Sequence, residues 1–227
     1  VLNRCRKAGK KIVFATARSK QASSKYFERF MPDVFVGYGG SLVLAENAEI
    51  YRFDIPADIS SSIIKECLET PEITSILAVN ESIALTNNLN EMTDTGHYQY
   101  TDSILDYYYR YLKISVISTS QDAVEKIAAN YPMCDMLRYT GENLYRFANR
   151  DAVKWNAVNA IAKYYNLDTN VFAAFGDDVN DMEMVEKCGV GIAVANAIDE
   201  VKAAADYICD SNDNDGVAKW LEENVLK

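Results

Sequence analysis

Four polar side chains follow one another closely, directly after an apolar run, in a pattern that could bind a cation. The apolar run covers residues 171–175, and Gly176 ends it. The four residues that follow within five positions are Asp177, Asp178, Asn180 and Asp181. Carboxylates this close repel one another unless a cation neutralises them, and oxygen ligands suit Mg²⁺. The alternative is an acidic helix N-terminus that the helix dipole stabilises without a metal.

Two further residues could bind a phosphate group. Thr16 follows a short apolar run at residues 12–15, and a hydroxyl with backbone amides before a helix forms a phosphate seat. Lys154 falls in the first turn of a helix predicted over residues 152–165, where the dipole disfavours a cation, so an anionic partner is indicated. Each residue also has a plain structural interpretation: Thr16 only ends its strand, and Lys154 is a solvated surface lysine.

The elements that must position these residues alternate between strand and helix at both ends of the chain. The strands are predicted at 12–15, 34–36, 171–175, 190–194 and 207–208, with a hairpin at 41–45 and 49–53. The helices are predicted at 20–30, 152–165, 199–205 and 217–225, and a helix is expected to start near Val179. This alternation indicates an α/β architecture.

The middle of the chain, residues 54–147, has a different pattern. Helices are predicted at 60–69 and 121–129, and strands at 75–79, 82–86, 113–118 and 144–147, with a loop over 87–100. We interpret this region as a separate α+β unit inserted into the α/β domain.

The composition excludes several classes of protein. The chain has 227 residues, of which 49% are hydrophobic, and a net charge of −10, which argues against nucleic acid or an anionic membrane as the main partner. No apolar run approaches a membrane span, and the first residues do not resemble a signal peptide. Five scattered cysteines predict reduced thiols in a cytoplasmic protein. With His97 as the single histidine, a histidine-based metal cluster is excluded, and no motif supports a Ser-His-Asp triad.

These motifs together resemble a known family. Phe-Ala-Thr-Ala-Arg at 14–18, Lys154, and Gly-Asp-Asp-Val-Asn-Asp at 176–181 resemble motifs II, III and IV of the haloacid dehalogenase-like (HAD) phosphatases. Val-Ala-Asn-Ala at 194–197 and Asp-Gly-Val-Ala at 215–218 are similar to the Cof-type sugar phosphatase branch. The resemblance implies a Rossmann-like core of parallel strands with helices on both faces, at residues 1–53 and 148–227. The insert at 54–147 would be a C2-type cap domain.

The resemblance also implies a role for each candidate residue. Asp177 would ligate Mg²⁺, and Asp181 would hold a metal-bound water or orient the site. Asn180 would bond to the substrate, Thr16 with the amide of Ala17 would bind the phosphoryl oxygens, and Lys154 would neutralise phosphate and nucleophile. The implied activity is Mg²⁺-dependent hydrolysis of small phosphorylated metabolites, such as sugar phosphates, through an aspartyl-phosphate.

Three departures from the family pattern affect this expectation. Ala17 stands where glycine is usual, and Tyr38 where asparagine is usual. The motif Asp-x-Asp-Gly-Thr, which supplies the nucleophile and the general acid, is not found before residue 14, and Asp213-Asn214-Asp215-Gly216 is at the wrong end of the chain to replace it. We expect this motif, with the first core strand, upstream of residue 1 in a longer natural protein or one whose start was misassigned.

Two alternatives to the enzyme remain open at this point. The chain could be an inactive fragment or pseudo-enzyme that binds phosphate ligands without turnover. Alternatively, Ser211, Asp213, Asp215 and Gly216, with Glu222, partly match a calcium-binding loop, although a serine occupies the first position.

Overall fold

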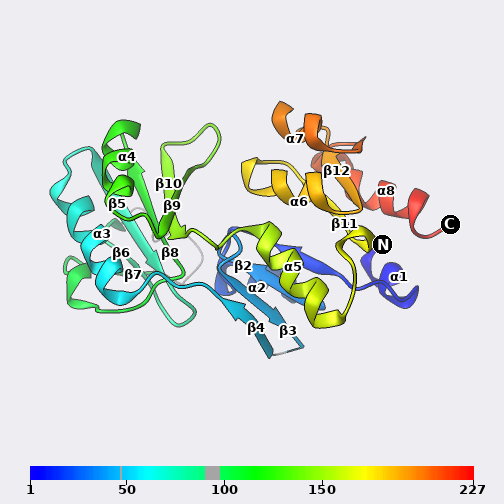
Figure 1. Ribbon diagram of the computed structural model, residues 1–227, viewed down its shortest axis with the longest axis horizontal. Helices are drawn as coiled ribbons and strands as arrows, with labels where there is room; N and C mark the ends of the chain where they lie inside the picture. Colours follow the sequence, from blue (N-terminus) through cyan, green and yellow to red (C-terminus); the bar gives the residue numbers. More distant parts are fainter. Residues whose placement is uncertain (47, 90–97) are drawn as a thin grey trace. The chain divides into compact units, whose positions relative to one another are not determined.

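The computed structural model describes residues 1–46, 48–89 and 98–227, and the chain divides into two compact units (Figure 1). Unit 1 comprises Val1–Thr16, Tyr26–Tyr51 and Val153–Lys227. Unit 2 comprises Ala17–Lys25 and Arg52–Ala152. Within the described residues, no helix is both long and apolar enough to cross a membrane.

The observed units differ in one segment from the division predicted at residues 53 and 147. Ala17–Lys25 groups with unit 2, although the sequence pattern assigned it to the core. Two side-chain bonds explain this placement, because Lys113 Nζ donates to the Ala17 carbonyl at 2.9 Å and the Gln21 amide donates to the Glu81 carbonyl.

Unit 1 contains a four-stranded sheet built from the first part of the chain. Its order is β1 (Val13–Ala15), β2 (Val34–Gly37), β3 (Leu42–Ala45) and β4 (Ala48–Arg52). β1 and β2 are parallel, and β2 and β3 are antiparallel. All four residues of β2 are buried, which is why this strand is continuously apolar rather than alternating.

A second sheet of unit 1 comes from the last part of the chain. It consists of the parallel strands β11 (Ala173–Gly176), β12 (Val190–Val194) and β13 (Tyr207–Cys209). The crossovers between them carry α6 (Met182–Lys187) and α7 (Asp199–Ala204), and α8 (Gly216–Asn224) ends the chain. Parallel strands joined by helices confirm the predicted α/β class.

The helix α5 (Lys154–Tyr165) connects the cores of the two sheets. Its Ala157 and Ile161 pack with the buried valines of β2 and β3, and its Trp155 and Val158 contact a cluster around Ala174. That second cluster also includes Ala15 of β1. Side chains from both sheets therefore share one hydrophobic interior.

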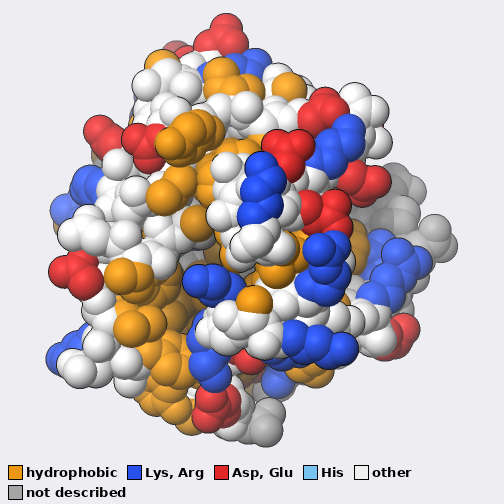
Figure 2. Space-filling view, turned by 90° about the vertical axis from the view of Figure 1, so that its right-hand side faces the viewer, with side chains coloured by type: hydrophobic (Ala, Val, Ile, Leu, Met, Phe, Trp, Pro, Cys, Tyr) orange, Lys and Arg blue, Asp and Glu red, His pale blue; other side chains and the backbone are white. Residues whose placement is uncertain are grey.

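β1 and β11 are edge strands, each with one paired neighbour among the described residues. Unit 1 also exposes large apolar side chains, and Figure 2 shows a band of hydrophobic side chains on the side that carries both termini. The exposed residues include Val171, Tyr207 and Ile208.

Two predicted elements differ from the structure. Residues 169–171 form a 3₁₀ turn before β11, so the strand expected from 171 starts two residues later, and Val171 is 67% exposed. The helix expected over 20–30 is reduced to a 3₁₀ turn, Gln21–Ser23, and α2 (Ser24–Phe27). The first helix of the chain is α1 (Leu2–Lys7).

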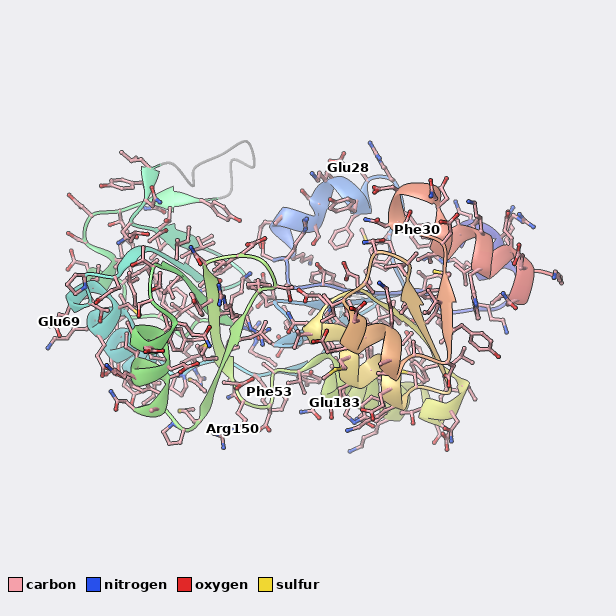
Figure 3. The ribbon with its side chains drawn as sticks, turned by 90° about the horizontal axis from the view of Figure 1, so that it is seen from above. Glu28, Phe30, Phe53, Glu69, Arg150 and Glu183 are labelled. Carbon is pink, nitrogen blue, oxygen red and sulfur yellow. The ribbon has the colours of Figure 1, made fainter. Side chains whose placement is uncertain are left out.

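Unit 2 is a six-stranded sheet with helices on one face. The order is β7 (Gln99–Tyr100), β6 (Ala84–Thr86), β5 (Ile73–Val79), β8 (Lys113–Ser118), β10 (Leu144–Asn149) and β9 (Cys134–Arg138). The helices are α3 (Ala57–Glu69) and α4 (Gln121–Ala129). Glu69, at the end of α3, points away from the sheet (Figure 3). The predicted α+β pattern is thus present, with β7 and β9 missed.

Each missed strand has a physical reason. β7 has two residues and lies within a polar segment expected to be a loop; residues 90–97 of that segment lie outside the described residues. β9 reads Cys-Asp-Met-Leu-Arg, which does not alternate clearly, and its pairing with β10 stabilises it.

The central strands of unit 2 present two different faces. Ile114, Val116, Tyr145 and Phe147 belong to the hydrophobic core, which includes buried residues of α3 and α4. Successive side chains of a strand point to opposite faces, so Lys113, Ser115 and Arg146 lie on the other face. The helix-free face of the sheet is therefore polar at its centre.

Candidate active site

The acidic stretch lies where β11 ends, in a tight turn rather than directly in a helix. Asp178 caps a 3₁₀ turn, Val179–Asp181, by accepting the Val179 N–H at 2.8 Å. α6 starts after this turn, three residues later than the start expected near Val179. The turn brings Asp181 back towards the end of β11, since its carboxylate accepts the N–H of Asp177 at 3.2 Å.

Lys154 forms a buried ion pair with Asp181. The distance between Lys154 Nζ and Asp181 Oδ1 is 2.5 Å, and the two side chains are 8% and 6% exposed. Lys154 is the first residue of α5, so its position against the helix dipole is offset by a carboxylate. The interpretation of Lys154 as a solvated surface lysine is therefore wrong, and motifs III and IV meet in space.

Two glycines make room for this pair. A Cβ on Gly176 would lie 2.4 Å from Cβ of Asp181. A Cβ on Gly40 would lie 2.5 Å from the carbonyl carbon of Val153 and 2.8 Å from the backbone nitrogen of Lys154. Gly40 also has a φ of +109°, a value that side chains disfavour. Close backbone approach at these glycines positions both members of the ion pair.

The turn around Gly40 also holds Thr16. The N–H of Thr16 donates to the Val36 carbonyl at 2.9 Å, and its carbonyl accepts the N–H of Gly39 at 3.0 Å. Thr16 is thereby fixed at the end of β1, beside the turn that packs against the start of α5. Ala17 groups with unit 2, where its carbonyl binds Lys113.

The repulsion between the carboxylates of Asp177 and Asp181 indicates whether the turn fits a divalent cation. The pKa of Asp177 is raised by partial removal from water and by the negative charge of Asp181, and Lys154 opposes this shift. A bound cation would relieve the same repulsion. The described part of the chain holds no group of three or more His, Cys, Asp or Glu side chains that could share a metal ion. Mg²⁺ commonly uses one or two protein carboxylates with substrate phosphate and water, so these residues fit such an ion.

The two carboxylates differ in how they are held. Asp181 uses one oxygen for Lys154 and the other for the N–H of Asp177, and it is 4% exposed. Asp177 is exposed, and its carbonyl accepts the N–H of Ile198 at 3.0 Å. Asn180 is half-buried in the same turn. The side chain that is open to a ligand is therefore that of Asp177, while Asp181 is held by its neighbours.

Two residues to which the sequence assigned no role support the site. The Tyr51 hydroxyl donates to the carbonyl of Gly40 at 2.7 Å. Tyr38 has a φ of +54° and is fully buried, and the Ser41 hydroxyl donates to its carbonyl at 3.1 Å. Asparagine, usual at position 38 in the family, tolerates this left-handed conformation better than tyrosine. The sequence named Tyr38 only as a departure from the family pattern, and Tyr51 has no motif that could have marked it.

The possible calcium loop near residue 213 has other partners. The Asp210 carboxylate accepts the N–H of Ser211 at 2.8 Å and binds Lys219 Nζ at 2.8 Å. Glu222 forms an ion pair with Arg4 of α1. Asp210, which precedes the loop, thus connects it to Lys219 of α8, and Glu222 connects α8 to α1.

Comparisons with known proteins identify the family of the chain. Residues 1–221 match the family described as haloacid dehalogenase-like hydrolase. The chain is 24% identical to the Bacillus subtilis 5-amino-6-(5-phospho-D-ribitylamino)uracil phosphatase YitU, covering 98% of this chain and 87% of the relative. It is 23% identical to YbjI from Escherichia coli, which is also named a 5-amino-6-(5-phospho-D-ribitylamino)uracil phosphatase, covering 91% of this chain and 82% of the relative.

Solved structures show the same fold. The HAD subclass IIB sugar phosphatase BT4131 superposes with a TM-score of 0.83 at 19% identity, covering 98% of this chain and 88% of that one. SMU.1108c from Streptococcus mutans superposes with a TM-score of 0.85 at 22% identity, covering 100% and 90%. The chain therefore belongs to the haloacid dehalogenase-like hydrolase family, as one of its phosphatases.

Proposed function

We propose that this protein hydrolyses the phosphate monoester of a small phosphorylated metabolite, with Mg²⁺ as cofactor. The observation that carries the proposal is the buried ion pair of Lys154 and Asp181 at the end of β11, next to the exposed carboxylate of Asp177. A buried lysine fixed beside two carboxylates supplies the mixed charge that binds a phosphate and a divalent cation together.

Each residue has a definite part in this reaction. Lys154 balances the negative charge of the phosphoryl group, and Asp181 fixes the ammonium in place. Thr16, with the amide of Ala17, donates hydrogen bonds to the phosphoryl oxygens, and Asn180 donates to the substrate. Such positioned donors act where the transition state is charged.

The covalent step needs a carboxylate nucleophile. A carboxylate oxygen attacks phosphorus, the ester oxygen leaves with a proton from a general acid, and water then hydrolyses the acyl phosphate. The family resemblance implies an aspartate for each of these two roles. We therefore assign Lys154 and Asp181 to charge balance and positioning rather than to nucleophilic attack.

Asp177 would hold Mg²⁺, with Asp181 as the second carboxylate. When bound, the ion supplies positive charge that offsets the phosphoryl oxygens. A cytoplasmic setting fits the five cysteines, which are all free and buried.

The test is phosphate release by the protein as its reading frame encodes it. The panel comprises sugar phosphates, pyridoxal phosphate, nucleotides and 5-amino-6-(5-phospho-D-ribitylamino)uracil, after which two relatives are named. We expect release with Mg²⁺, loss of release with excess EDTA, and loss of release in Asp177→Asn. Glu183→Gln, a change on the exposed face of α6, serves as the control. No release from any compound would refute the proposed hydrolysis.

The second candidate is a phosphate binder without turnover. This candidate predicts that sugar phosphates raise the melting temperature while no phosphate is released. Release above the rate of Asp177→Asn excludes it.

A further inference from the structure

A buried turn connects two of the residues that we expect to bind the phosphoryl group. The turn covers residues 37–41, all of which are buried. On one side, the N–H of Gly39 donates to the carbonyl of Thr16 at 3.0 Å. On the other side, Gly40 lies so close to the start of α5 that a Cβ would be 2.8 Å from the backbone nitrogen of Lys154. Through this turn, Thr16 and Lys154 are fixed relative to each other within unit 1.

The backbone of this turn has an uncommon conformation. The φ angles of Tyr38, Gly39 and Gly40 are +54°, +76° and +109°. A tyrosine with a positive φ persists only where the surrounding contacts hold it there. Gly40 is also buried, so its carbonyl needs a hydrogen-bond donor from the protein. The geometry of the turn therefore depends on groups outside it.

The Tyr51 hydroxyl supplies this donor. It donates to the Gly40 carbonyl at 2.7 Å. Tyr51 belongs to β4, and its ring packs against the hydrophobic cluster that contains Ala157 of α5. Burial raises the pKa of Tyr51 above its ordinary value of 10.0, so the hydroxyl keeps its proton and remains a donor at neutral pH. One residue thus contacts both the turn and the core that holds α5.

We propose that Tyr51 is a positioning residue for phosphoryl transfer, which acts through Gly40 to set the spacing between Thr16 and Lys154. This inference rests on the proposed function, in which Thr16 and Lys154 bind the phosphoryl group. Donors and charges stabilise a transition state only while their geometry is kept, and a small displacement of a catalytic group costs up to about 10²-fold in rate. Tyr51 acts through the turn and takes part in no chemical step itself.

A hydrogen bond that served only stability would behave differently from this positioning bond. Its loss would lower the melting temperature and leave the kinetic constants of the folded enzyme unchanged. The loss of a positioning bond lowers kcat more than it raises KM, because the interaction matters most in the transition state. It also weakens the binding of a transition-state analogue more than the binding of a ground-state ligand.

The experiment compares Tyr51→Phe with a matched control, Tyr165→Phe. Tyr165 packs against the same hydrophobic cluster, and within the part of the chain that the structure describes its buried hydroxyl has no hydrogen-bond partner. Both variants therefore remove one hydroxyl from the same core, but only Tyr51→Phe removes a bond to the turn. The protein as its reading frame encodes it is assayed with Mg²⁺, on the compound of the panel that it hydrolyses fastest, well below the melting temperature of each variant.

We expect Tyr51→Phe to lower kcat about tenfold and to change KM less than about twofold. Inhibition by orthovanadate, which adopts the five-coordinate geometry of phosphoryl transfer, should weaken about tenfold, and inhibition by inorganic phosphate less than about twofold. Tyr165→Phe should leave all four constants unchanged. An unchanged kcat in Tyr51→Phe, an equal loss in both variants, or a loss of kcat without weaker inhibition by vanadate overturns the proposal.

Binding measurements separate this inference from the hydrolase proposal. If no compound releases phosphate, the hydrolase proposal fails, and calorimetry with orthovanadate and inorganic phosphate replaces the kinetics. Vanadate binding that weakens in Tyr51→Phe and not in Tyr165→Phe then supports the positioning role, and unchanged binding refutes it. If phosphate is released equally fast by the wild type and Tyr51→Phe, the hydrolase proposal stands and the positioning role fails. A protein that binds neither anion refutes both.

Discussion

The two units hold their buried cations in opposite ways. In unit 1, Lys154 is paired with Asp181 at 2.5 Å, so the charge is neutralised within the chain. In unit 2, Lys113 is near Arg146 and Arg18, and its pKa is lowered to about 8 by burial and by these charges. In the first arrangement a carboxylate offsets the cost of burying the ammonium, whereas in the second burial and the neighbouring positive charges all disfavour the charged form of the lysine. The comparison shows that a fixed carboxylate, rather than burial alone, decides how a buried lysine is held.

The largest expected effect comes from removing the cation of unit 1. Lys154→Met leaves the carboxylate of Asp181 buried without its partner, which typically lowers the free energy of unfolding by about 3–5 kcal/mol. Urea denaturation measures this change, and phosphate release should be lost. The control is Lys187→Met, which breaks an exposed 2.5 Å pair with Glu183 and should cost less than about 1 kcal/mol. Equal losses for the two variants would contradict the difference between buried and exposed pairs.

A double variant sharpens this first test. Lys154→Met with Asp181→Leu removes both charges, so it should recover much of the stability lost in Lys154→Met. Phosphate release should not recover, because the charge that balances the phosphate is still absent. Recovery of both would mean that the pair is only structural.

The next effect concerns the backbone that positions Lys154. Gly40→Ala puts a methyl group 2.5 Å from the Val153 carbonyl carbon, and we expect a loss of about 1–3 kcal/mol with reduced phosphate release. Gly9→Ala is the control, since Gly9 also has a positive φ, +81°, but its Cβ would meet nothing within 4 Å. Gly9→Ala should cost about 1 kcal/mol and leave turnover unchanged. Similar turnover in both variants would remove Gly40 from the site.

Lys113 of unit 2 predicts a pH dependence. The pKa of Lys113 is lower in the folded protein, about 8, than its ordinary value of 10.5, chiefly because the group is buried. The unfolded chain therefore binds more protons between these values, so Lys113 makes the free energy of unfolding rise as pH increases from about 8 to about 10.5. Subtracting the pH profile of Lys113→Met from that of the wild type isolates this rise, on the order of 1 kcal/mol. A flat difference would show that neither burial nor the neighbouring positive charges shift the pKa of Lys113.

The smallest expected effect tests the support behind Gly40. Tyr51→Phe removes the hydroxyl that donates to the Gly40 carbonyl at 2.7 Å and should cost about 0.5–1.5 kcal/mol. Tyr164→Phe changes an exposed tyrosine that is 46% accessible and should have almost no effect in the same urea titration. A loss in Tyr164→Phe as large as that in Tyr51→Phe would contradict a specific role for this hydrogen bond.

Much of the fold follows from local patterns. The strands at β8 and β12 and the helix α4 match their predicted bounds, because alternation and caps such as Ser120 are local signals. β7 and β9 were missed because their pairing partners, not their own residues, make them strands. The grouping of Ala17–Lys25 with unit 2 was not visible in the sequence for a similar reason, since its contacts with Lys113 and Glu81 are distant in sequence.

The sequence by itself determined which residue types form the candidate site: Asp177 and Asp181 after a strand, Lys154 at a helix start, and Thr16 at a strand end. The tertiary structure decided how these groups are arranged. It paired Lys154 with Asp181, left Asp177 exposed, and placed Gly40 next to the start of α5, where Tyr51 binds its carbonyl. It also brought Arg146 and Arg18 near Lys113. Such contacts join residues far apart in the chain, and strand register and burial, which arise only on folding, set their charges and pKa values.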